Sequence, residues 1–263
     1  MYWLYTILLT FICISGMVRA ESSPIAPPTI STVQNNISTQ KSLTPLKITV
    51  TTKAPYFTEK DDGFLDLLLV EIGNRSGIKF EVLKNIPPAR ALSKLNQGTT
   101  DGDFPRVSGL EEIYPSLIHI PEKIVDFQFV AFSYEECIYP ISFDSIQESK
   151  VGLIIGWKIY EQQTKNFSHL TTIKKPPQLF NLLQRKRIQY ALHEHYIGNK
   201  FITELALENE IYECAPALMI KPMYFYLHKK HQMLVPAISR ALKEIKADGT
   251  YQRIALETLP NKK

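Results

Sequence analysis

The sequence predicts an α/β protein built of two similar lobes. Short β-branched runs alternate with amphipathic runs along most of the chain, and the order strand, helix, strand, helix occurs twice. The chain has 263 residues, of which 44% are hydrophobic and 21% are charged. This composition supplies enough apolar material for one large core or two smaller ones. The alternation of elements predicts parallel βαβ units in each lobe.

The N-terminal segment has the composition of an export signal followed by a tether. Residues 1–20 form an apolar run that ends in Val18-Arg19-Ala20, a pattern typical of a signal-peptide cleavage site. We expect cleavage after Ala20 and a periplasmic location. A retained membrane anchor is the alternative, because no Lys or Arg precedes the apolar run. Residues 21–45 are rich in Ser, Thr, Pro and Asn, which predicts a flexible tether.

The elements of the first half follow from their residue types. A β-branched strand is predicted from Leu46, and a turn follows at residues 54–57. The next run offers Asp61 or Asp62 as a helix N-cap and Gly77 as a stop. The remaining predictions are a strand at 78–83, a helix at 87–98 with proline in its first turn, and a third strand after Gly98.

The second half repeats this order. A strand at 151–157 is predicted to run into a helix that starts near Trp157, and the final helices are broken at Asp248-Gly249. The other predicted strands cover residues 125–133, 188–194, 217–220 and 223–230, and the other helices cover 176–187, 201–210 and two parts of 235–259.

Charge and cysteine content restrict the classes of function. The net charge is +4 and the basic residues are scattered, so we expect no nucleic-acid partner. Cys137 and Cys214 are the thiols that remain after signal cleavage. An oxidising compartment would permit a disulfide between them, and two buried free thiols are the alternative. The sequence contains no nucleophile elbow, phosphate-binding loop or zinc-protease motif, which leaves those enzyme classes without support.

Six runs carry a resemblance to a known family. They are Pro55-Tyr56-Phe57 after the opening strand, Gly63 to Leu67, RALSKLNQGTTDG at 90–102, VGLIIGW at 151–157, the helix and strand at 179–194, and the closing helices at 234–254. In this order they resemble the type II periplasmic solute-binding proteins of family 3. That group includes the polar amino-acid receptors of ABC transporters. The resemblance covers about residues 46–257.

The resemblance implies a fold of two α/β lobes, each a mixed sheet flanked by helices, joined by two crossover strands. Carried over, the first lobe comprises residues 46–131 plus 222–263, and the second comprises 132–221. The crossings are expected near residues 132–134 and 220–222. Hinges there would let the lobes close over a ligand.

The resemblance also implies a function. We expect a monomeric periplasmic receptor, without a cofactor, that encloses a small polar ligand for ABC-type uptake with a permease as partner. The ligand would be an amino acid or another carboxylate. Two alternatives stay open. A few members of this fold resemble receptors but are cyclohexadienyl dehydratases. If this chain has that activity, Glu194 or His193 would be its acid catalyst. A sensor or partner-binding protein without transport is the other.

Arg106 is the first candidate for the site. The resemblance implies that an arginine after the third strand of the first lobe forms a forked contact with the ligand's carboxylate, which a planar guanidinium provides and a lysine does not. The alternative is that Arg106 pairs with Asp101 or Asp103 and only stabilises the turn.

Three further candidates come from strand ends. The resemblance implies that Glu194 accepts the ligand's ammonium, and the alternative is a solvated strand-end glutamate. Tyr56 and Trp157 each follow a strand at a turn, so their rings would stack on the ligand or pack in the lobe cores. His193 and His195 would share one face of a strand, but two ligands without a third predict no metal site.

Overall fold

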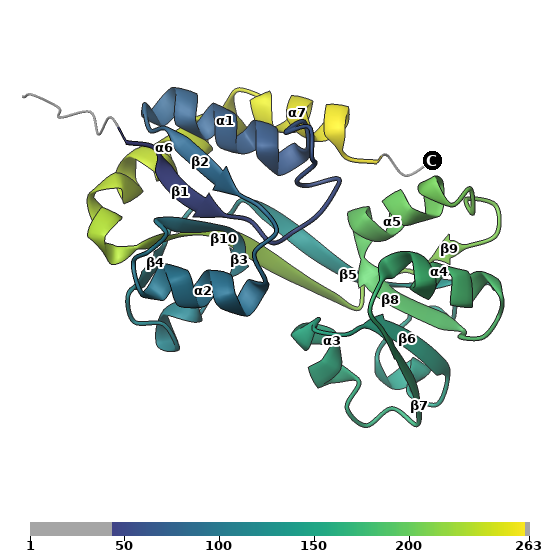
Figure 1. Ribbon diagram of the computed structural model, residues 1–263. Coiled ribbons are helices and arrows are strands. Elements are labelled where there is room, and N and C mark those ends of the chain that lie inside the picture. Colours follow the sequence, from purple (N-terminus) through teal and green to yellow (C-terminus); the bar gives the residue numbers. More distant parts are fainter. Residues whose placement is uncertain (1–43, 261–263) are drawn as a thin grey trace, which may run out of the picture. The chain divides into compact units, whose positions relative to one another are not determined.

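The computed structural model describes residues 44–260 (Figure 1). The predicted signal peptide, and the predicted tether up to residue 43, lie outside the described residues. Within the described part of the chain, none of the helices has both the length and the apolar character needed to cross a membrane.

One continuous path of strands runs through both lobes and confirms the α/β class. The order is β2-β1-β3-β10-β5-β8-β6-β7, with β4 paired to β10 and β9 paired to β5. Pairing is parallel within β2-β1-β3 and within β8-β6-β7, and antiparallel where β10 and β5 join the two groups. The strands are β1 Leu46–Thr49, β2 Phe80–Leu83, β3 Gly102–Val107, β4 Leu117–His119, β5 Val125–Ser133, β6 Lys150–Ile154, β7 His169–Ile173, β8 Tyr190–Glu194, β9 Tyr212–Glu213 and β10 Met219–His228.

The two long strands β5 and β10 belong to both lobes (Figure 1). β5 pairs with β10 from Val125 to Phe129 and with β8 from Phe129 to Phe132. β10 pairs with β5 from Met219 to Met223 and then with β3. The change of partner in β5 therefore comes at Phe129, a few residues before the crossing expected at 132–134.

The helices cover the strands, and in the first lobe α1 lies beside the C-terminal helices α6 and α7 (Figure 1). The helix α1 begins at Phe64, so neither Asp61 nor Asp62 is the N-cap that the sequence predicts. Gly63 is its N-cap, where a Cβ atom would lie 2.5 Å from the Tyr56 carbonyl oxygen, and Gly77 ends it with φ of 71°. The α-helices are α1 Phe64–Ser76, α2 Pro88–Asn96, α3 Lys158–Gln163, α4 Pro176–Gln184, α5 His195–Glu204, α6 Val235–Ala247 and α7 Thr250–Thr258.

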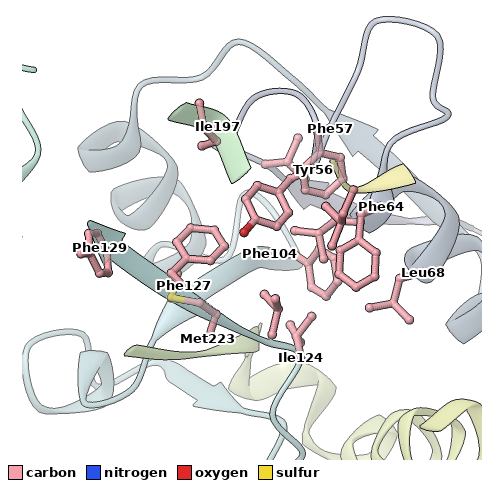
Figure 2. Close-up of a cluster of buried hydrophobic side chains, with 14 of the residues drawn as sticks. Tyr56, Phe57, Phe64, Leu68, Phe104, Ile124, Phe127, Phe129, Ile197 and Met223 are labelled. Atoms are coloured by element: carbon pink, nitrogen blue, oxygen red, sulfur yellow. The ribbon is translucent and has the colours of Figure 1, made fainter. Parts of the chain in front are cut away.

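A cluster of buried apolar side chains extends through both lobes. In the first lobe it contains Phe64 and Phe104, and along the shared strand β5 it contains Phe127 and Phe129. Figure 2 shows the Tyr56 ring beside that of Phe127 within this cluster. The apolar cluster continues along β5 from the first lobe into the second. Burial of apolar surface in this one cluster therefore stabilises both lobes.

Several predicted elements differ from the structure. The helix predicted at 201–210 is α5, which begins at His195 because the Glu194 carboxylate accepts a hydrogen bond from the Ile197 backbone N–H. His195 is therefore helical, and the shared strand face predicted for the two histidines is wrong. The strands predicted at 217–220 and 223–230 are one strand, β10, that continues through Pro222.

Candidate ligand-binding site

The carboxyl ends of three parallel strands bring polar side chains together in the first lobe. Lys53 follows β1, Asn85 follows β2, and Arg106 lies at the end of β3. The Lys53 ammonium donates to the Asn85 side-chain oxygen at 2.9 Å, and Arg106 Nη2 donates to the Pro88 carbonyl oxygen at 3.3 Å. Ligands of open α/β sheets bind outside such strand ends, so this edge is the first half of the candidate site.

Arg106 forms the ion pair expected of a turn-stabilising residue. Its Nη2 lies 2.7 Å from the Asp103 carboxylate, which is completely buried. Burial raises the pKa of Asp103, and the Arg106 guanidinium acts in the opposite direction. Within residues 44–260, the buried Nε of Arg106 has no hydrogen-bond partner. The side-chain hydrogen bonds to Asp103 and Pro88 both come from Nη2, so the guanidinium has not used all its donors on the turn.

Tyr56 and Glu194 contact each other across the two lobes. The Tyr56 hydroxyl donates to Glu194 Oε1 at 2.9 Å, and Glu194 Oε2 accepts the N–H of Ile197. Both residues are 0% exposed, so neither presents an open surface to solvent. The alternative of a solvated strand-end glutamate is therefore wrong. A direct contact of Glu194 with a ligand's ammonium requires its bond to Tyr56 to open.

Burial controls the electrostatics of this contact. Desolvation raises the pKa of Glu194 to about 7, although the hydrogen bonds from the Ile197 N–H and the Tyr56 hydroxyl act to lower it. The pKa of Tyr56 is raised above its usual range by burial and by the nearby Glu194 carboxylate. The contact therefore joins a neutral phenol to a carboxyl group that accepts protons more readily than an ordinary glutamate.

Trp157 lies at the second-lobe end of a row of aromatic rings along β5. The Tyr56 ring is stacked on Phe127 with centroids 4.8 Å apart, and Phe127 contacts Phe129. The Trp157 ring lies 6.1 Å from that of Phe129 and 4.9 Å from that of His193. Trp157 is half-buried, unlike Tyr56, and retains surface for a ligand. No contact of the structure joins Arg106 to the other three candidates within the described residues.

The two histidines near Glu194 have separate structural roles. His193 is buried among rings, its Nδ1 accepts the Glu194 backbone N–H, and burial lowers its pKa to about 4. His195 Nδ1 lies 2.5 Å from the carboxylate of Glu213, which Asn199 also contacts. Among residues 44–260, no group of three or more histidine, cysteine, aspartate or glutamate side chains is arranged to hold a metal ion.

Sequence reasoning missed Lys53 and left one covalent link open. Lys53 stands in the turn directly after the first strand, beside the candidate Tyr56, and its position at a strand end was the available signal. Cys137 and Cys214 form a disulfide, so the alternative of two free thiols is wrong.

Comparison with known proteins adds one sequence relative and many structures of similar fold. No family model matches the chain. An uncharacterized protein of Shewanella oneidensis is 25% identical over 258 residues, which cover 92% of this chain and 89% of that protein.

Solved structures resemble the chain far more closely in fold than in sequence. The GluR0 ligand-binding core in complex with L-glutamate has a TM-score of 0.70 at 12% identity, covering 83% of this chain and 100% of that one. A histidine kinase sensor domain similar to periplasmic binding proteins has a TM-score of 0.67 at 15% identity, covering 83% and 98%. The arginine-, lysine-, histidine-binding protein ArtJ from Geobacillus stearothermophilus has a TM-score of 0.63 at 14% identity, covering 82% and 95%. With its strand order, these likenesses show that the chain has the two-lobed periplasmic-binding-protein-like fold.

Proposed function

We propose that this protein is a periplasmic receptor that encloses a small, polar, carboxylate-bearing ligand between its two lobes. The observation that carries the proposal is Arg106, a mostly buried guanidinium at the strand-end edge of the first lobe whose Nε lacks a partner in the described structure. A buried donor without a partner costs free energy, about 1–3 kcal/mol, and a bound anion would offset this cost by completing the guanidinium's hydrogen bonds. The likeness to amino-acid-binding proteins supports the same function.

The other candidates take distinct parts in this proposal. Trp157 offers the half-buried ring against which the ligand packs from the second lobe. Tyr56 and Glu194 hold the lobes together beside the site through their buried hydrogen bond. We assign residues 46–131 plus 222–263 to the first lobe and 132–221 to the second, as the sequence predicts. The receptor would act as a monomer that delivers its ligand to an ABC permease.

The sensor alternative has support of its own, because one structure of this fold is the sensor domain of a histidine kinase. The receptor and sensor functions use the same ligand site and differ only in the partner. The dehydratase alternative receives less support. Its candidate acids, Glu194 and His193, are 0% and 1% exposed, and a general acid must reach its substrate.

Substitution of Arg106 tests the proposal. The ligand would be identified by native mass spectrometry of protein purified from an exporting host, and its affinity measured by calorimetry. Arg106→Lys keeps the charge but loses the fork, and Arg106→Ala loses both. We expect alanine to cost about 2–5 kcal/mol of binding free energy, or roughly a thirtyfold to several-thousandfold loss of affinity.

The same variants distinguish binding from a purely structural role. If Arg106 only stabilises the turn with Asp103, Arg106→Ala will lower the melting temperature of the unliganded protein and leave its ligand affinity unchanged. That result, or a protein that neither carries nor binds any small molecule, would contradict the proposed function.

A further inference from the structure

The sheet of the second lobe ends at an open edge. β7 is the last strand of the path and, among the described strands, pairs only with β6 (Figure 1). The Ile173 carbonyl oxygen accepts the Ile155 N–H on the β6 side. Because the main-chain groups of successive strand residues point to opposite edges, the N–H and C=O of Thr172 face outward. β7 can therefore pair with one more strand.

A cavity of about 530 Å³ lies beside this edge, between β7 and the helix α4. Ile173 and Leu182 form its apolar part, and its polar lining consists of Thr172, Lys174, Gln178, Asn181 and Arg185. These five polar residues are exposed, and within residues 44–260 their side chains make no hydrogen bond or ion pair. The cavity therefore joins unused side-chain donors to the unused main-chain groups of an edge strand.

The cavity lining contains two cationic groups and no carboxylate. Lys174 directly follows β7, and Arg185 directly follows α4. The nine residues of α4 lie between them, a length of about 14 Å. An extended chain rises about 3.3 Å per residue, so side chains four residues apart in such a chain, which share one face, match this separation.

The neighbouring carboxylates lie outside the lining. Near the start of β7, Glu148 accepts the Ser168 hydroxyl, and near the end of α4, Glu210 accepts the Gln184 side-chain amide. The exposed Glu208 also lies outside the lining. In the chain itself, residues 162–193 contain no aspartate or glutamate. These acids therefore limit the positive charge at the margins of the cavity but do not pair with its two cations.

We propose that the β7 edge and α4 bind an extended acidic segment of a partner protein, which adds a strand to the second lobe. Main-chain pairing with β7 would hold the segment, and its carboxylates would contact Lys174 and Arg185. The inference goes beyond the proposed ligand function, since none of the four candidate ligand-binding residues lines this cavity.

The same two cations restrict which strand can pair. A neutral strand would leave both of them without a partner charge. A second copy of this chain that offered its own β7 edge would place Lys174 and Arg185 against like charges, which is unfavourable. The edge therefore favours an acidic partner over pairing of this protein with itself.

A short acidic peptide tests the surface on the mature chain. The probe is the acetylated and amidated peptide TDVEVDT, whose acidic side chains share one face when it is extended. TNVQVNT is its neutral counterpart. We expect the acidic peptide to bind with a Kd of about 1 mM or tighter and the neutral one at least about tenfold more weakly. Amide shifts of nitrogen-15-labelled protein measure both constants, and the shifts should be confined to β7, α4 and the residues adjoining them.

Two double variants separate the cavity from the overall charge. Lys174→Gln with Arg185→Gln removes both cations of the lining and should weaken binding of the acidic peptide at least about tenfold. The control is Lys150→Gln with Lys165→Gln, two exposed lysines of the same lobe that do not line the cavity. The control makes the same change in net charge and should leave the affinity unchanged. Circular dichroism confirms that each variant is folded.

Methylation of the peptide tests strand addition itself. A strand presents alternate N–H groups to its two edges, so two acidic peptides are made, each methylated on one of the two sets of amides. We expect their affinities to differ at least about tenfold, because methyl groups on the edge that faces β7 block main-chain pairing.

Each result either supports the inference or overturns it. If the acidic peptide does not bind at about 5 mM, Lys174 serves only to protect the edge from pairing, and the inference fails. If the neutral peptide binds as tightly, the acidic partner class is wrong. Equal affinities of the cavity variant and the control would overturn the assignment of Lys174 and Arg185. If both methylated peptides bind as tightly as the parent, strand addition is overturned.

Discussion

Glu194 is the residue whose environment most alters its chemistry. Its carboxyl group is 0% exposed, and burial raises its pKa from 4.5 to about 7. The adjacent His193 is affected in the opposite direction, since burial lowers its pKa from 6.5 to about 4. In both residues the uncharged form is favoured, as expected for ionisable groups without a fully compensating charge.

The raised pKa of Glu194 predicts a pH-dependent stability. A carboxyl group with a higher pKa in the folded protein than in the unfolded chain binds its proton more tightly when folded. It therefore loses its contribution to stability as pH rises from 4.5 to about 7. Glu194→Gln removes this titration but keeps an oxygen that accepts a hydrogen bond. We expect the variant to gain stability relative to the unmodified protein across that window, by at most about 3 kcal/mol.

Urea unfolding between about pH 5 and about pH 8 measures this difference. The buried His193 loses stability as pH falls below its unfolded pKa of 6.5, which is the opposite sign. Because His193 is present in both proteins, its effect cancels in the difference between them. A difference in unfolding free energy that stays constant with pH would show that Glu194 is ionised normally in the folded protein.

At the scale of single elements, the helix α5 depends on a close contact with the shared strand β5. A Cβ atom built on Gly198 would lie 2.4 Å from two ring atoms of Phe132, which is completely buried and packs on Phe180. The glycine is therefore required by the approach of the helix to the ring, since helix propensity alone favours alanine by about 1 kcal/mol.

Gly198→Ala tests which effect is larger. Overpacking a core costs about 1–3 kcal/mol, so we expect the substitution to lower the free energy of unfolding by about 1–2 kcal/mol despite the better helix propensity. Phe132→Leu removes ring atoms, and the double variant should recover part of the loss. Denaturant unfolding of the four proteins gives the coupling. A more stable Gly198→Ala protein would mean that Phe132 moves aside at little cost.

The elements also show what sequence patterns can predict. The alternation of strands and helices was sufficient for the fold class, because it reflects burial of apolar residues along each element. The start of α5 was missed because its N-cap is the carboxylate of Glu194, whereas shorter polar side chains are the usual caps. The short strands β4 and β7 were missed as well. In β7 four of its five residues are partly or fully exposed, so it has no buried alternation to detect.

The positions of the candidate residues in the fold could be predicted from the sequence, but their contacts could not. The family resemblance implied Arg106 and Glu194, whereas Tyr56 and Trp157 were candidates because each follows a strand at a turn. The structure places each of the four at a strand end or in the turn that follows a strand. The pair of Tyr56 and Glu194 is separated by 138 residues, and no local pattern specifies which strand ends meet. Lys53 was missed because a lysine in a turn is ordinarily a solvated residue.

At the scale of the whole molecule, the second lobe is formed by the segment of chain that lies between the neighbouring strands β5 and β10. The chain leaves the shared pair after β5 and returns at Met219, which pairs with Phe129. The disulfide between Cys137 and Cys214 joins positions near the two ends of this segment, at a sequence separation of 77. The link therefore restricts nearly the entire second lobe when the chain is unfolded.

Removal of the disulfide should destabilise the protein substantially. In the chain-entropy account, closing a loop of this length stabilises the folded state by about 4 kcal/mol, within a usual range of about 2–5. We expect the double variant Cys137→Ser, Cys214→Ser to lose this amount in urea unfolding followed by the fluorescence of Trp157. Reduced unmodified protein is the control and should behave like the double variant. Equal stability of the oxidised and reduced proteins would contradict the expectation.

The position of β10 in the sheet constrains the order in which the protein is completed during synthesis. β10 is the last strand to be made, yet it lies between β3 and β5, and the helices that pack on α1 come after it. The first lobe begins with the earliest strands but is unfinished until the second lobe has been synthesised. A chain that terminates before Met219 would expose the facing edges of β3 and β5 in the middle of the sheet, and unpaired strand edges are sites of aggregation. Premature stops in the second lobe should therefore yield insoluble products, because they leave the first lobe open.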